Sequence, residues 1–134
     1  MNATIISKLA KATQDGSIPF PEIVGRLMDE GIEYYQVDYR TLQLTFYGTV
    51  GGVVVAPLIF DNLPEVGEAF DLIGLRAAIH DSQVNGQKFH DFSVRAMSAG
   101  VQSYYAFLSG KRVMYLGRLG DQHIEWFPGA KPTE

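Results

Sequence analysis

The spacing of hydrophobic residues changes along the chain from a helical to a strand period, and it does so twice. Apolar residues recur at helical spacing over residues 3–14 and 20–30, and again over 71–84 and 89–99. Alternation or short apolar runs follow at 32–39, 42–48 and 52–60, and then at 101–108, 111–117 and 121–127. The pattern predicts two helices followed by three strands, and then the same series once more.

Residues that favour caps and turns stand at the ends of these segments. Asp71 is suited to cap the helix that follows it, and Gly31 and Gly100 lie where the second helix of each half should end. Ser109-Gly110 indicates a hairpin turn. Because short hairpins require antiparallel pairing, we expect an α+β fold in which helices pack on one face of an antiparallel sheet.

The chain also resembles itself. At an offset of 69, eight pairs are identical within the 38 positions from 14 to 51, where chance gives roughly two. The pairs are Gln14/Gln83, Phe20/Phe89, Arg26/Arg95, Met28/Met97, Gly31/Gly100, Tyr35/Tyr104, Gly48/Gly117 and Gly51/Gly120. We interpret this as a duplication. It predicts one domain over residues 1–134, with two tandem ααβββ repeats that share one core: repeat 1 at about 1–60, a link at 61–70, and repeat 2 at about 71–128.

The alternation also assigns the two faces of the sheet. In the first half, Tyr35 and Val37 should meet the helices, and their neighbours should point away. If equivalent residues of the second half point to the same sides, its outer face is apolar and consists of Tyr105, Phe107, Met114 and Leu116. We therefore expect something to cover it. A second copy, the other half's sheet and the tail 129–134 are candidates, and so is a small molecule.

Composition narrows the possible partners. The net charge of −4 argues against non-specific binding to nucleic acid or anionic lipid, although Lys111, Arg112 and Arg118 gather near one hairpin. The longest apolar run, 53–60, is far too short to span a bilayer. The chain has no cysteine, which excludes disulfides and thiolate chemistry and fits a cytoplasmic protein.

The densest cluster of polar functional groups lies near the C-terminal end. His123 and Glu125 are two residues apart on a strand, so they point to the same side, and Arg118 precedes them across the turn. An acid–base pair, a metal site with a further ligand or an anion site fits these residues, and so does a solvated strand with an ion pair. Asp38 and Tyr47 should lie on the outer face of the first half and are further candidates for binding.

Two other histidines stand beside acids, His80 next to Asp81 and His90 next to Asp91. A helix surface explains them without a metal, and no complete set of metal ligands is predicted. The motifs of nucleotide binding and hydrolysis are absent from the sequence. The leading hypothesis is a non-catalytic module for a small ligand or a protein, forming a homodimer through the apolar outer face. The alternative is an enzyme or metal-binding protein with a site around Arg118, His123 and Glu125, with an unknown cofactor.

A stretch from Gly117 to Pro128 carries the pattern Gly-Arg-x-Gly-x-x-His-x-Glu-x-Phe-Pro. With residues 31–38, 77–86 and 97–100, it resembles an uncharacterised bacterial domain family that includes prophage-encoded members and is often labelled phage envelope protein-like. The resemblance implies no particular activity, substrate or cofactor, and a virion role rests on the label alone. Leu116 stands where this family usually has an aromatic residue, and Ser93 stands where a cysteine sometimes occurs.

Overall fold

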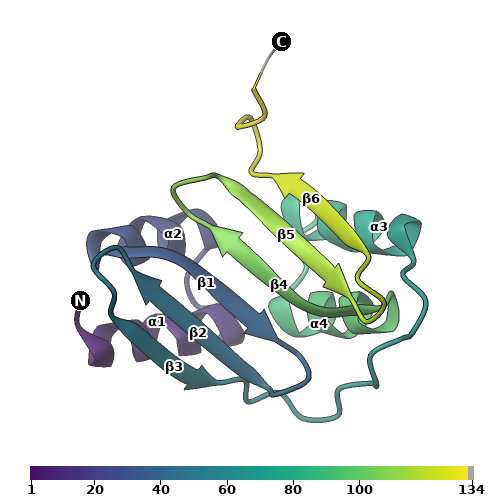
Figure 1. The fold of residues 1–134 in the computed structure, drawn as a ribbon, viewed down its shortest axis with the longest axis horizontal. Coiled ribbons are helices and arrows are strands. Elements are labelled where there is room, and N and C mark those ends of the chain that lie inside the picture. Colours follow the sequence, from purple (N-terminus) through teal and green to yellow (C-terminus); the bar gives the residue numbers. More distant parts are fainter. Residues whose placement is uncertain (133–134) are drawn as a thin grey trace.

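Two helices and three strands follow one another, and the same series then repeats (Figure 1). The computed structural model describes residues 1–132. The first half contains α1 (Ala3–Asp15), α2 (Phe20–Asp29), β1 (Ile32–Asp38), β2 (Gln43–Gly48) and β3 (Val53–Pro57). The second contains α3 (Leu72–Val84), α4 (Phe89–Ser98), β4 (Val101–Phe107), β5 (Arg112–Gly117) and β6 (Gln122–Trp126). Each element of the second half begins and ends 69 residues after its counterpart, while the duplication itself stays a prediction.

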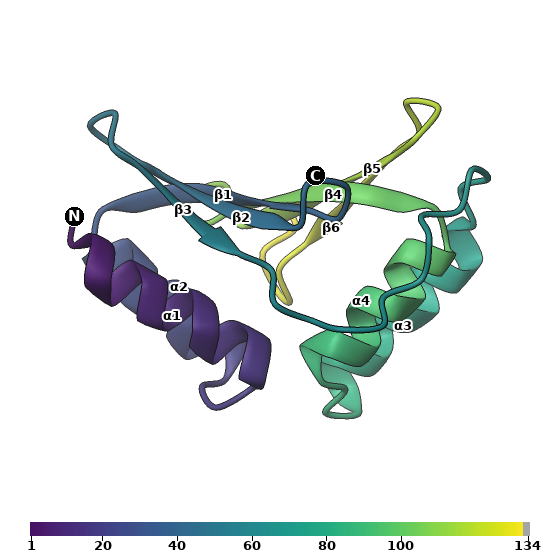
Figure 2. The same ribbon diagram turned by 90° about the horizontal axis from the view of Figure 1, so that it is seen from below.

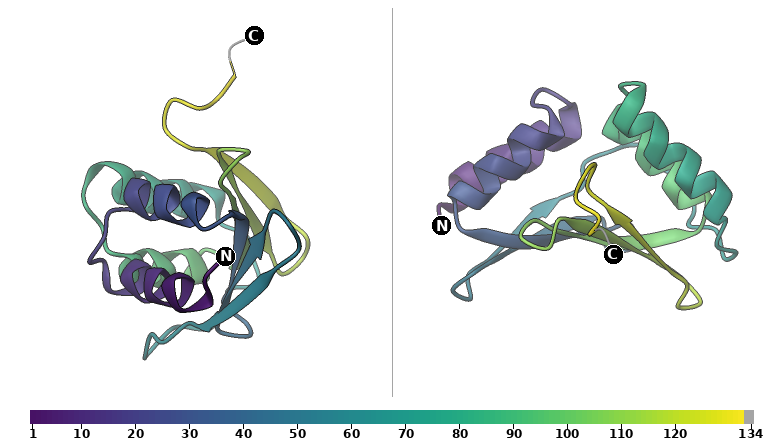
Figure 3. Two further views of the ribbon diagram at one scale, coloured as in Figure 1. Left: turned by 90° about the vertical axis from the view of Figure 1, so that its left-hand side faces the viewer. Right: turned by 90° about the horizontal axis from the view of Figure 1, so that it is seen from above.

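The six strands form one antiparallel sheet in the order β3-β2-β1-β4-β5-β6. Each half supplies three neighbouring strands, and β1 pairs with β4 at the centre. All four helices lie on one face of the sheet (Figure 2), as two pairs inclined to each other (Figure 3). The predicted α+β class, with helices packed on an antiparallel sheet, is confirmed. No helix within residues 1–132 is both long and apolar enough to cross a membrane.

The ends of the elements follow local chemistry, with two differences from the sequence prediction. Asp71 accepts a hydrogen bond from the N–H of Gly74 and caps α3 as expected. The third strand ends at Pro57 instead of residue 60, opposite Gln43, the residue at which its partner strand β2 begins. In the two β hairpins that start from β1 and β4, the left-handed residues are Leu42 and Lys111 rather than a glycine.

The core fills the space between the sheet and the helices. Its largest fully buried side chains include Phe46, Ile6, Ile23, Leu27, Leu44 and Leu75. Residues from both halves belong to one cluster, and contacts also cross the seam between the helix pairs. The ring of Phe127 packs on that of Phe20, and the ring of Phe60 packs on that of Phe89. The Tyr39 hydroxyl of the first half donates to Ser93 Oγ of the second, 2.9 Å away.

The predicted faces of the sheet are also confirmed. Tyr35 and Val37 pair with Ala106 and Tyr104 on the helix side. Tyr105 and Phe107 point away from the helices, in register with Gln36 and Tyr34. The side of the sheet that carries no helix is called the open face below.

Candidate functional site

His123 and Glu125 lie on β6 and point to the helix side of the sheet, opposite the open face. In the register they pair with Tyr115 and Val113 of β5. Nε2 of His123 lies 3.0 Å from Oε1 of Glu125, so an Nε2–H donates to the carboxylate and leaves Nδ1 as the free ring nitrogen. The imidazole stacks on the ring of Tyr115, and its side chain is 11% exposed. The pair is therefore shielded and oriented instead of standing on a solvated strand.

This pair opens onto a groove of about 590 Å³ between α3 and β6, called the edge groove. Its volume lies within the range of small-ligand sites. One wall is a stripe of α3 at helical spacing, with Arg76, Ile79, His80 and Gln83, and the other wall is β6 with the segment that follows it. The lining residues are Arg76, Ile79, His80, Gln83, His123 to Gly129 and Lys131.

The charges around the edge groove favour an acidic ligand. Among residues 1–132, Arg76 and Lys131 contribute two cations to the lining, whereas Glu125 is its one acidic side chain. Its carboxylate already lies within hydrogen-bond distance of His123. The groove combines this polar rim with the apolar side chains of Ile79 and Phe127.

The structure does not bring Arg118 into this groove. Its guanidinium donates to the carbonyl of Val66 at 3.1 Å and so ties the β5–β6 turn to the link between the halves. Asp38 accepts hydrogen bonds from the N–H groups of Arg40 and Thr41 and stabilises the turn after β1. Tyr47 lies on the open face. Of the five residues nominated from the sequence, only His123 and Glu125 come together.

The two other histidines interact with their neighbouring aspartates and not with His123 or Glu125. The side chain of His80 is 66% exposed and lies 3.9 Å from the Asp81 carboxylate, at the rim of the edge groove. Nδ1 of His90 lies 3.2 Å from Asp91, and its ring packs edge-on against Phe60. Within residues 1–132, no three histidine or carboxylate side chains come close enough together to hold a metal ion.

Four tyrosines on the helix side of the sheet form a cluster that sequence reasoning did not recognise as a group: Tyr35, Tyr39, Tyr104 and Tyr115. Burial raises the pKa of each phenol, so all four stay protonated at neutral pH. The alternation of polar and apolar residues had placed these positions inside, and the identity of Tyr35 and Tyr104 was a further signal. What the alternation does not encode is that Tyr104 of β4 contacts both Tyr39 of the first half and Tyr115 of β5.

The open face displays aromatic and aliphatic side chains across all six strands. Tyr34 stacks on Tyr47, and Tyr105 stacks on Phe107. At the register-paired outward positions the only charged residues are Asp38 and Arg112, and Arg112 lies 3.9 Å over the ring of Trp126. The outward residues of the middle and edge strands also include Val53, Val55, Met114, Leu116 and Ile124.

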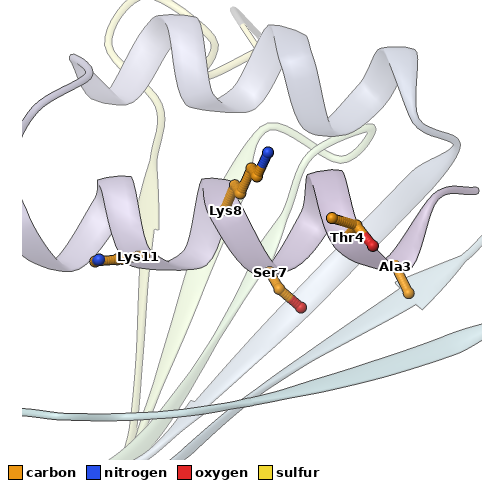
Figure 4. A pocket seen from close by; sticks show the side chains of 5 residues that line it. All are labelled: Ala3, Thr4, Ser7, Lys8 and Lys11. Atoms are coloured by element: carbon orange, nitrogen blue, oxygen red, sulfur yellow. The ribbon is translucent and has the colours of Figure 1, made fainter.

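A second hollow, of about 400 Å³, lies along α1 (Figure 4). All five lining residues come from this one helix: Ala3, Thr4, Ser7, Lys8 and Lys11. In the close view the labelled side chains of Ser7 and Lys8 point in different directions. Because no second element presents groups that converge with them, we regard this hollow as an ordinary helix surface.

Comparison with known proteins adds no relative. No protein-family model matches this chain, and no curated protein is significantly similar to it in sequence.

Proposed function

We propose that this protein is a non-catalytic interaction module that pairs with a second copy of itself through the open face. The observation behind this proposal is the composition of that face, which presents aromatic rings and aliphatic side chains with almost no charge. Interface cores are enriched in aromatic residues, methionine and arginine and depleted of other charges. The residues of the open face follow this pattern, with Arg112 laid over Trp126.

The dimensions of the open face also suit a dimer. Six strands of five to seven residues span roughly 24 Å by 20 Å. Side chains that stand out from a sheet give it an accessible area larger than this projection. The projection is about 480 Å², and each partner in a stable interface buries roughly 800 Å², so a dimer would use the whole open face. Closed two-fold pairing is the commonest form of self-association and would cover the same face on both copies.

We infer that the halves arose by duplication, because every element recurs at an offset of 69 residues. The absence of cysteine favours the cytoplasm. The resemblance to phage envelope protein-like domains is kept as a proposal about ancestry.

Sedimentation velocity over the micromolar range tests the dimer. Tyr105 is half-buried at the centre of the open face, where its ring contacts those of Tyr34 and Phe107, so Tyr105→Glu should place a charge in the interface and convert a dimer to a monomer. Ile73→Glu is the matched control, because Ile73 is 85% exposed on α3, away from this face. A parent protein that sediments as a monomer throughout, or a Tyr105→Glu variant that still dimerises, would contradict the proposal.

A further inference from the structure

The strand β6 forms one edge of the sheet, and its outer backbone groups have no partner within residues 1–132. The N–H of Phe127 donates to Lys111 O, and the N–H of Gly117 donates to Asp121 O. Alternate residues of an antiparallel strand face its neighbour, so the N–H and C=O groups of residues 122, 124 and 126 point to the free edge. Such a row of free groups is a template for another strand.

The opposite edge of the sheet is held at the end of its strand β3, while the outward N–H and C=O groups of Val53 and Val55 make no hydrogen bond within residues 1–132. There α1 packs directly against β3, and the Gln14 amide reaches the extended backbone at the end of the strand. Its Nε2 donates to Pro57 O at 3.0 Å, and its Oε1 accepts from the N–H of Ile59 at 2.8 Å. Pro57 itself offers no N–H. In the first half, therefore, a buried glutamine binds an extended peptide backbone beside an edge strand.

Gln83 is the counterpart of Gln14, and it lines the edge groove. The position equivalent to Ile59 is Pro128, which has no N–H to donate to the glutamine oxygen. After β6 the chain then turns, with a left-handed Gly129 and a hydrogen bond from Ala130 N–H to Phe127 O. Gln83 is exposed, and its amide makes no hydrogen bond within residues 1–132. Gln83 can therefore form with another chain the backbone hydrogen bonds that Gln14 forms within the first half.

We propose that the edge groove binds an extended acidic peptide of a partner protein, which adds to β6 as a seventh strand. Main-chain hydrogen bonds to Ile124 hold the peptide, and the Gln83 amide binds its backbone as Gln14 binds residues 57–59. Arg76 and Lys131 pair with its acidic side chains. The edge groove shares Ile124 and Trp126 with the border of the open face, but the inference depends on the free edge of β6 and on α3 and not on the proposed dimer.

A displayed library of random octapeptides, selected on the full chain, tests the inference. We expect acidic binders, and we expect Ile124→Pro to weaken each of them at least tenfold, because it removes one outward N–H while leaving the β5 pairing in place. Val55→Pro is the matched control, since Val55 occupies the equivalent outward position on β3. It should leave binding unchanged.

Two substitutions on the exposed face of α3 keep the test valid if Ile124→Pro does not fold. Gln83→Ala and Arg76→Glu should each weaken the selected peptides by about tenfold, equal to 1.4 kcal/mol. Failure to enrich acidic peptides would overturn the inference. So would binders that are insensitive to all three groove variants, or an edge already filled by a second copy of β6. Binding that appears only after removal of residues 129–134 would also overturn it, because the chain's own tail would then be the occupant.

Discussion

The two edges of the sheet have equivalent helices, strands and glutamines, but the glutamines differ in their hydrogen bonds. In the first half α1 lies on β3, and Gln14, which is 7% exposed, holds the backbone of the chain that leaves the strand. In the second half the identical Gln83 is exposed beside an open groove. The difference shows that an identical residue in a repeated position keeps its role only if its partner is retained, and Pro128 in place of Ile59 removes that partner.

The equivalent arginines, Arg26 and Arg95, differ in the same way. Arg26 pairs with Glu22 one turn earlier in its own helix. Arg95 reaches from α4 to Asp81 of α3 at 2.6 Å and to Gln87 at 2.7 Å. In the second half this cross-helix bond joins the helix pair, whereas in the first half the arginine stays on one helix surface.

The largest change in stability is expected for a substitution in the shared core, and it tests whether the two halves unfold independently. Phe46 is 2% exposed, and its counterpart Tyr115 lies under the other helix pair. Phe46→Ala should lower the free energy of unfolding by about 3–5 kcal/mol because it leaves a cavity in the shared core. Urea unfolding should still show a single transition, reported alike by circular dichroism and by fluorescence of Trp126. Two separate transitions would show that the halves unfold independently.

A smaller effect should separate the two glutamines. Gln14→Ala leaves Pro57 O and the N–H of Ile59 without their partner, so we expect a loss of about 1–3 kcal/mol. Gln83→Ala should change stability by no more than about 0.5 kcal/mol, because this side chain is exposed and makes no hydrogen bond to the described residues, 1–132. Urea unfolding of both variants measures the difference. Equal losses in the free energy of unfolding would mean that the two glutamines stabilise their edges to the same extent.

The smallest effect concerns acid stability and the helix pair of the second half. The hydrogen bond from Arg95, followed by that from Asn85, lowers the pKa of Asp81. A carboxyl whose pKa is depressed by folding contributes its stability above the unfolded value of about 3.9, and loses it as pH falls through the folded value. Asp81→Asn should therefore lose less stability between about pH 5 and pH 3 than the parent. Thermal unfolding across this range measures the effect, with Glu22→Gln, the partner of Arg26, as control.

Much of the site was visible in the sequence, but its surroundings were not. The two-residue spacing of His123 and Glu125 placed both on one side of a strand, and the structure shows them hydrogen-bonded. Their surroundings depend on α3, which supplies Arg76, Ile79, His80 and Gln83 to the groove beside β6. Arg118 seemed to belong with them because it is close in sequence. It instead bonds to Val66, and no local pattern encodes a contact across 52 residues.

The sequence by itself determined the order of the elements, their caps and the face that each strand turns to the helices. These properties depend on the 3.6- and 2-residue periods and on turn residues, which act over a few positions. Only the tertiary structure decided that six strands make one sheet with β1 against β4, that Tyr39, Tyr104 and Tyr115 meet beneath the helices, and that Gln14 holds the chain after β3 while Gln83 faces an open groove beside β6. Those outcomes depend on pairing between distant segments and on the direction in which the chain leaves its last strand, where Pro128 cannot offer an N–H to Gln83.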